Sequence, residues 1–371
     1  MSLSRRDLLR AGAASAAAGS LGCAIFGGGA DRKDLLARQK EPFNGEPRLH
    51  ELDEDWITPY SRFFVRSHGR IPDVAPGEYL LTIEGHVNRV QQFTLEDLQR
   101  GRRASSTATI QCAENRKGEL ARIKAVDGIP WDAGAIGTAE WRGVRLADLL
   151  ERAGPRPGAR NVWFEGLDAA TLPDRQTVYG SELPLGRAMR PENLIALEMN
   201  GSPLPREHGY PARLVAPGCT GSRSVKWLGR IVVAERRSEN VFAAADVRDS
   251  EPIVDQPLNS AICRPRPGET VKAGKLQVTG YAVPPGAPGS ALAEVEVSPD
   301  GGATWAAAQL AAQQAPLAWR LWRAEVDVAA GLQTLVVRAT DATGARQPER
   351  STWNPKGTLC NGWHRVPITG A

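Results

Sequence analysis

The most informative segment of the chain is Gln111–Lys117, which reads Gln-Cys-Ala-Glu-Asn-Arg-Lys. In it Cys112 precedes the basic pair Arg116 and Lys117 by only a few residues. Nearby cations lower the pKa of a thiol and favour the thiolate, which is the form that a soft metal ion binds. Taken alone, the segment also fits a buried structural cysteine beside a solvated basic turn. Other motifs of the chain must therefore distinguish a metal ligand from a core residue.

Two further segments carry cations in a setting that suits anion binding. Phe63–His68 places Arg66 and His68 after an apolar stretch, and Pro217–Arg230 combines glycines with basic residues. Guanidinium groups bind phosphate through two parallel hydrogen bonds, and glycine lets the backbone approach closely. The chain therefore contains a candidate phosphate-binding set, which consists of Arg213, Ser222, Arg223 and Lys226.

The pattern of apolar residues divides the 371-residue chain into two parts. The first part contains a predicted strand at 79–83 and two predicted helices, one that begins after Thr94 and one that covers 145–150. After a proline-broken stretch at 246–257 the pattern alternates, and strands are predicted at 275–281, 293–297, 322–328 and 334–339. We therefore expect an α+β fold whose residues 258–371 form an all-β, immunoglobulin-like sandwich.

Residues 1–30 differ from the rest of the chain. Arg5 and Arg6 precede an Ala-rich apolar run that is too short for a stable membrane span. This arrangement resembles a twin-arginine export signal, a route for proteins that fold around a cofactor before export. We therefore expect a periplasmic or other extracytoplasmic location, with Cys23 as a candidate lipid attachment site and membrane tether.

Charge and cysteine content exclude some classes of protein. Lys and Arg number 46 against 42 Asp and Glu, a balance too even for a nucleic-acid-binding protein. The five cysteines are an odd number and form no Cys-x-x-Cys pair, so a regular disulfide framework is not expected. A disulfide between Cys263 and Cys360 stays open.

In their order along the chain these motifs resemble the sulfite oxidase family of molybdopterin enzymes. The resemblance runs from about Phe63 to Pro367 and includes Trp353–Gly357 and Asn361–Val366. It implies a molybdopterin-binding catalytic domain at 41–245 and a second domain that forms a homodimer. It also implies one pyranopterin, no haem on this chain, and Cys112 as the protein ligand of molybdenum.

The resemblance also implies roles for individual side chains. The positions that line the pocket for an oxyanion substrate are Arg66, Lys117, Trp131 and Lys356. The positions that hold the pterin and its phosphate are Phe64, His68, His208, Arg213, Ser222, Arg223 and Lys226. His208 also fits a structural histidine, and Trp131 also fits a core residue.

Several positions depart from the family pattern. Lys117 and Lys356 replace arginine, and lysine lacks the planar fork that grips an oxyanion through two hydrogen bonds. By ungapped counting, Val247 replaces a tyrosine that sulfite oxidases place beside the metal. Glu114 replaces a glycine, and we expect its carboxylate to point outward, toward Arg116 or Lys117, because an inward carboxylate would oppose anion binding.

The function implied by the resemblance is oxygen-atom transfer at molybdenum, most simply the oxidation of sulfite or a related sulfur compound. Arg66, Lys117 and Lys356 would hold the anion, and a separate acceptor, such as a cytochrome c, would take the electrons. Reduction of nitrate, a sulfoxide or another oxo-substrate is an alternative on the same fold. A non-catalytic exported scaffold is a second alternative, which Cys112 disfavours and Val247 favours.

Overall fold

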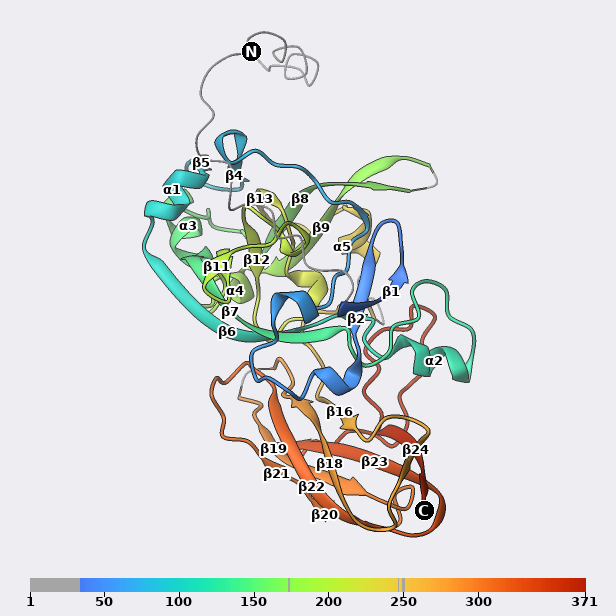
Figure 1. The fold of residues 1–371 in the computed structure, drawn as a ribbon. Helices are drawn as coiled ribbons and strands as arrows, with labels where there is room; N and C mark the ends of the chain where they lie inside the picture. The colour runs from blue at the N-terminus through green and yellow to red at the C-terminus, as the bar shows by residue number, and fades with distance from the viewer. Residues whose placement is uncertain (1–33, 173, 246, 249–250, 288) are drawn as a thin grey trace, which may run out of the picture.

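The computed structural model describes residues 34–371 except 173, 246, 249–250 and 288. The chain forms two domains, and the second, drawn in orange and red in Figure 1, consists of strands. The helices are short and lie in the first domain. Their bounds are α1 Leu95–Arg100, α2 Lys117–Ile123, α3 Leu146–Ala153, α4 Leu185–Ala188 and α5 Val241–Ala245. The predicted α+β class is confirmed.

Two sheets form the frame of the first domain. Their strands are β3 Gly69–Arg70, β4 Leu80–Gly85, β5 Gln91–Thr94, β6 Arg103–Gln111, β7 Ile136–Arg145, β8 Asn161–Thr171, β9 Gln176–Pro184, β10 Leu194–Met199, β11 Ser202–Pro203, β12 Arg213–Val215 and β13 Leu228–Ala234. One sheet has the order β11-β10-β7-β6 with β12 beside β10. The other has the order β3-β8-β13-β4-β5 with β9 beside β8. A separate hairpin pairs β1 Leu35–Gln39 with β2 Asn44–Pro47.

Local sequence explains the bounds of the predicted helices. The Thr94 hydroxyl accepts a hydrogen bond from the Asp97 N–H at 3.1 Å, and the Asp97 carboxylate accepts one from the Thr94 N–H at 2.9 Å. This capping box begins α1 as predicted. Helix α3 ends at Gly154, whose φ of 67° is a conformation that glycine adopts at little cost. The apolar face of α3, including Leu150, packs against Leu81 in the core.

The second domain is a sandwich of two sheets with orders β16-β18-β22-β21 and β17-β24-β23-β19-β20. The strands are β16 Asn259–Arg264, β17 Glu269–Val271, β18 Gly274–Val283, β19 Leu292–Ser298, β20 Ala306–Ala307, β21 Gln309–Leu310, β22 Arg320–Val328, β23 Gly331–Asp341 and β24 His364–Gly370. Inward side chains such as Val278, Val295 and Val337 form its core. The strands predicted from alternation correspond to β18, β19, β22 and β23, and the predicted sandwich is confirmed.

Arg116 joins the two domains. Its side chain is fully buried, donates to the side-chain Oδ1 of Asn259 at 2.7 Å and forms an ion pair with Glu119 at 2.7 Å. Its φ of 67° is unusual for a residue other than glycine and is held by these contacts. Nearby, the Tyr281 hydroxyl donates to the Ala133 carbonyl at 2.7 Å. The segment that begins at Gln111 is therefore fixed partly by the second domain.

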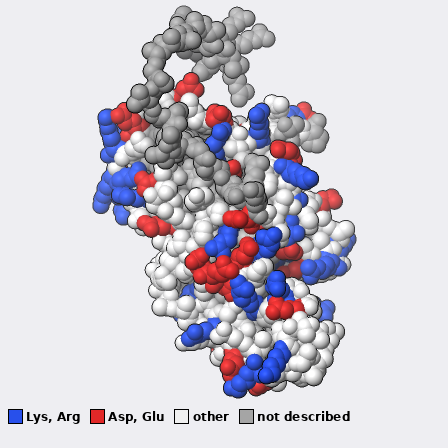
Figure 2. All heavy atoms as spheres, in the orientation of Figure 1, with Lys and Arg blue, Asp and Glu red and all other residues white. Residues whose placement is uncertain are grey.

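Charged side chains of both signs are interspersed over the face drawn in Figure 2. Charged side chains also link the domains: Arg264 forms ion pairs with Asp53 at 3.3 Å and Glu54 at 2.9 Å. This mixed surface agrees with the balanced composition. In the part of the chain that the structure describes, no helix is long and apolar enough to cross a membrane.

The described cysteines are all free thiols, so the disulfide between Cys263 and Cys360 that the sequence left open is not formed. The export signal at 1–30 and Cys23 lie outside the described residues. The backbone of Val247 belongs to β14 Val247–Arg248, which pairs with β15 Glu251–Pro252. The side chain of Val247 lies outside the described part.

Candidate active site

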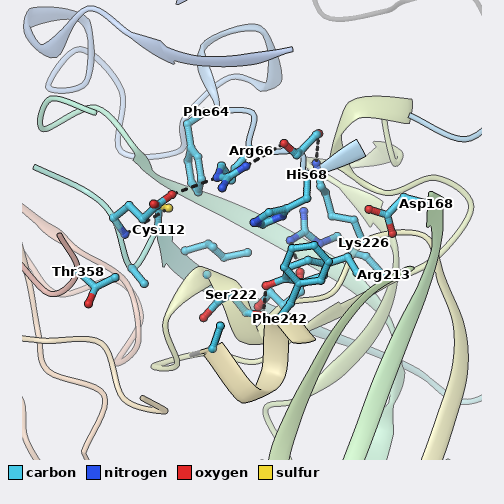
Figure 3. Close-up of a pocket in the computed structure, with 18 of the residues that line it drawn as sticks. Phe64, Arg66, His68, Cys112, Asp168, Arg213, Ser222, Lys226, Phe242 and Thr358 are labelled. Carbon is cyan, nitrogen blue, oxygen red and sulfur yellow. Dashed lines mark hydrogen bonds and ion pairs between the residues drawn. The ribbon is translucent and has the colours of Figure 1, made fainter. Parts of the chain in front are cut away.

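A cavity of about 410 Å³ lies between the end of β6, the segment after Phe63 and the glycine-rich segment before β13. It gathers predicted site residues from distant parts of the chain, among them one from the second domain. In Figure 3, Arg66 extends toward Cys112, while Asp168, Lys226 and Arg213 lie at the other end of the cavity. The predicted residues that line it are Phe64, Arg66, His68, Cys112, Lys117, His208, Arg213, Ser222, Lys226 and Lys356.

Cys112 follows the last residue of β6, and its N–H donates to the Ala135 carbonyl at 2.9 Å. The Glu114 N–H donates to its sulfur at 3.4 Å. Burial, with a smaller contribution from Glu114, raises the pKa of the Cys112 thiol to about 12. The charges of Arg66 and Lys117 lower this pKa, but their effect is smaller than that of burial. The predicted lowering of this pKa is therefore wrong, because burial outweighs the neighbouring cations and Arg116 faces the other domain. A bound metal ion would itself favour the thiolate.

Glu114 points into the cavity, which corrects the expectation that it points outward. Its carboxylate lies 2.8 Å from the Lys117 ammonium and 3.2 Å from the Arg66 guanidinium. Burial would raise the pKa of Glu114, but the charges of Arg66 and Lys117 outweigh it and hold this pKa below its ordinary value. The predicted pairing with Lys117 is present, and the pair faces the cavity.

The second domain completes the cavity beside Lys117. Lys356 and Thr358 line it, and the Lys356 ammonium donates to the Ala245 carbonyl at the end of α5. Gly357, with φ of 62°, packs so closely that a Cβ would lie 2.7 Å from the Lys117 side chain. Glycine is therefore required between two residues of the cavity wall.

Two buried cations lie at the opposite end. Arg213 donates to the carbonyl oxygens of His208 at 2.9 Å and Ser224 at 3.1 Å, and burial lowers its pKa to about 9. Lys226 donates to the Glu207 carbonyl at 2.8 Å and the Ser67 hydroxyl at 3.2 Å. Burial and Arg213 lower the pKa of Lys226 to about 7. Both cations hydrogen-bond neutral acceptors, so the electrostatic cost of burying them would fall if an anion bound here.

Asp168 is a cavity residue that the sequence analysis missed. It is 2% exposed, and its Oδ1 has no hydrogen-bond partner within the described residues. Burial raises the pKa of Asp168 to about 6, although the positive charge of Lys226 acts to lower it. It lies where the register of β8 against β9 shifts, between Glu165 and Ala169. The only signal in the sequence was one carboxylate in a short run of apolar and small residues.

An aromatic wall closes the same end of the cavity. The His68 ring stacks on Tyr179 with centroids 4.7 Å apart and contacts Phe242 at 4.7 Å. The Tyr179 hydroxyl donates to the Ser222 carbonyl at 2.9 Å. Burial, Arg66 and Lys226 lower the pKa of His68 well below its ordinary value, so the imidazole is neutral at neutral pH. Tyr179 and Phe242 were not predicted, because the stack forms only between segments distant in sequence.

Two predicted site residues do not line the cavity. Trp131 is fully buried in a cluster with Phe63 and Phe64, and its carbonyl accepts the Gly118 N–H at 2.9 Å. Arg223 is also fully buried and donates to the Ile253 carbonyl at 2.7 Å. The structure therefore does not place Trp131 or Arg223 in the wall of the cavity, and their predicted roles stay predictions.

Comparison with known proteins agrees with this geometry. Residues 68–242 match the oxidoreductase molybdopterin binding domain, and residues 250–371 match the Mo-co oxidoreductase dimerisation domain. Chicken sulfite oxidase is 40% identical over 358 residues, which cover 89% of this chain and 77% of that protein. The chain belongs to the sulfite oxidase family. Sulfite oxidase from Arabidopsis thaliana, at 35% identity, is covered over 93% of its length and covers 90% of this chain.

A human relative and one solved structure are also similar to this chain. Human mitochondrial sulfite oxidase is 41% identical across 90% of this chain, which spans 65% of the human protein's length. The crystal structure of the sulfane dehydrogenase SoxCD from Paracoccus pantotrophus matches with a TM-score of 0.78 and 29% identity, covering 90% of this chain and 86% of that chain. The recognition of the family and of its molybdopterin cofactor is confirmed.

The cavity fits the molybdopterin of the sulfite oxidase family on structural grounds. Arg213 and Lys226 are buried cations suited to a phosphate. The unpartnered oxygen of Asp168 suits the N–H donors of a pterin ring, since a buried acceptor without a partner is costly. Cys112 supplies the thiolate that molybdenum requires. These residues surround one cavity, so together they are suited to hold the group.

We expect the cofactor-free protein to become more stable as the pH rises above 7. Between the lowered pKa of Lys226, about 7, and its ordinary value of 10.5, the unfolded chain binds a proton that the folded chain does not. The free energy of unfolding therefore rises with pH through this window, and Lys226 adds no pH dependence below it. Urea midpoints at pH 7 and pH 9 measure the rise, which Lys226→Met should reduce. An equal rise in wild type and variant would contradict this prediction.

Proposed function

We propose that this protein is a molybdenum-dependent oxidoreductase that oxidises a sulfur compound by oxygen-atom transfer and passes the electrons to a separate acceptor. The observation that carries the proposal is one cavity with a buried thiol at one end, beside the cations Arg66 and Lys117, and two buried cations at the other. Similarity to sulfite oxidases and to a sulfane dehydrogenase supports sulfur as the element that is oxidised.

Each part of the cavity has a separate task in this proposal. Cys112 holds the metal, Arg213, Ser222 and Lys226 hold the phosphate, and Asp168 orients the pterin ring. When bound, the cofactor supplies two-electron redox chemistry and oxygen-atom transfer. The side chains that bind the substrate anion and neutralise its charge are Arg66, Lys117 and Lys356. Their electrostatic attraction for the anion is stronger in a cavity with little water.

The proposal includes a cellular setting. The match of residues 250–371 to a dimerisation domain supports a homodimer, whose mass light scattering can measure. We propose export by the twin-arginine signal at 1–30 to the periplasm, with a cytochrome c as electron acceptor and Cys23 as a lipid tether. A protein that stays in the cytoplasm when Arg5 and Arg6 are both replaced by Lys, and is exported when they are intact, would support this route.

The decisive experiment is steady-state turnover of the molybdenum-loaded protein. Ferricyanide or cytochrome c serves as acceptor for sulfite and for a sulfane compound, and reduced viologen serves as donor for nitrate. Cys112→Ala removes the metal ligand, and Cys219→Ala is the matched control, because Cys219 is also buried but does not line the cavity.

We expect sulfur oxidation in wild type and in the Cys219 variant and none in the Cys112 variant. Nitrate reduction without sulfur oxidation would replace the proposal with the reductase alternative. No turnover of any of these substrates by protein with a full molybdenum content would favour the non-catalytic scaffold.

A further inference from the structure

The carboxylate of Glu114 forms ion pairs with Arg66 and Lys117, the two cations of the cavity that lie beside Cys112. Its two oxygens lie 2.8 Å from the Lys117 ammonium and 3.2 Å from the Arg66 guanidinium. Its backbone N–H donates to the sulfur of Cys112, the predicted metal ligand, so Glu114 adjoins that ligand. An oxyanion bound next to Cys112 must therefore compete with a carboxylate that is already in place.

The ion pairs of Glu114 with Arg66 and Lys117 lower the net positive charge that a substrate meets. Arg66 and Lys117 carry two positive charges, and Glu114 cancels one of them. The side chains of Glu114 and Lys117 are only 19% and 4% exposed, so water screens this interaction weakly. Lys356, the other cation of the substrate pocket, donates to the Ala245 carbonyl, a neutral acceptor that leaves the charge of Lys356 in place. The positive charge available to a doubly charged anion is therefore smaller than the cation content suggests.

We propose that Glu114 is a specificity-determining residue that disfavours a dianion such as sulfite and favours a sulfur substrate with at most one negative charge, such as an organic sulfinate. The cluster of Arg66, Lys117 and Glu114 keeps one net positive charge, which matches the single negative charge of a monoanion. A dianion either displaces Glu114 or binds with a carboxylate close by, and both carry an electrostatic cost. An uncharged or monoanionic sulfur group avoids most of this cost.

The corresponding reaction rests on the proposed function. Oxidation of a sulfinate to a sulfonate forms one sulfur–oxygen bond, takes the oxygen from water, and releases two protons and two electrons. The electrons go one at a time to the separate acceptor of the proposed function. The reaction is the same transfer that converts sulfite to sulfate, with an organic group in place of one charged oxygen.

The test compares anion binding with turnover. Sulfate and methanesulfonate are titrated by calorimetry into oxidised holoenzyme, and sulfite and methanesulfinate are assayed with ferricyanide. The variants are Glu114→Gln, which removes the charge but keeps the shape, and Glu114→Gly, which removes the side chain. Asp127→Asn is the matched control, because Asp127 also lines the cavity but forms no ion pair with Arg66 or Lys117 in the described chain.

We expect wild type to bind methanesulfonate more tightly than sulfate and to have a lower KM for methanesulfinate than for sulfite. Both Glu114 variants should bind sulfate roughly tenfold more tightly and lower the KM for sulfite, with a smaller change for the monoanions. Equal sulfate affinity in wild type and both variants would overturn the inference, and so would an equal gain in Asp127→Asn. If no sulfur compound is oxidised but sulfate binding shifts as expected, the proposed function fails and the role of Glu114 stands.

Discussion

Arg213→Leu is expected to yield protein with less than about a tenth of the wild-type molybdenum and pterin content, because truncating one partner of a buried charge pair costs roughly 2–5 kcal/mol of binding free energy. Arg213 is 5% exposed and is fixed by the carbonyls of His208 and Ser224, so its guanidinium is preorganised for a phosphate. Leucine offers no hydrogen bond and no charge. Metal analysis and pterin fluorescence of the purified protein measure the loss.

Two further variants separate cofactor binding from folding. Arg230→Leu removes an exposed arginine that pairs with Glu84 and Glu165 at the surface, and it should keep its full cofactor content. Lys226→Met tests the second buried cation without removing the hydrogen bonds that Arg213 makes, and it should also lose cofactor. A full complement of molybdenum in both Arg213→Leu and Lys226→Met would show that the phosphate lies elsewhere.

Arg116→Met is expected to lower the free energy of unfolding by about 3–5 kcal/mol, which is the usual cost of breaking a buried ion pair by removing one partner. Arg116 is fully buried, and Glu119 and Asn259 would lose a charged partner. Although burial alone would lower the pKa of Arg116, Glu119 raises it above its ordinary value. Denaturant unfolding followed by tryptophan fluorescence and circular dichroism measures the change.

The surface pair of Arg100 with Glu96 provides the control for this prediction. These side chains are 75% and 66% exposed, and exposed pairs contribute about 0–1 kcal/mol, so Arg100→Met should have little effect. A double variant, Arg116→Met with Glu119→Gln, should be less destabilised than the sum of the single changes, because each single change leaves one unpaired charge whereas the double variant leaves none. Equal effects of Arg116→Met and Arg100→Met would contradict the structural role of Arg116.

The family and most of the residues that meet in the cavity could be predicted from the sequence alone. Cys112, Arg66 and Arg213 lie in short motifs whose residue types have few other uses in combination. The alternating strands of the second domain and the caps of α1 and α3 were also predictable, because their signals are local. The same local reasoning cannot say which way a side chain points.

The electrostatics of the site could not be predicted in this way, because they depend on tertiary contacts. Burial, which no local motif reports, raises the pKa of Cys112 and lowers that of Lys226. Arg116 and Glu114 are neighbours of the same cysteine, yet the first turns into the other domain and the second into the cavity. Local spacing brought all these groups near Cys112, but contacts between distant segments determine which charges face the cavity and how strongly water screens them.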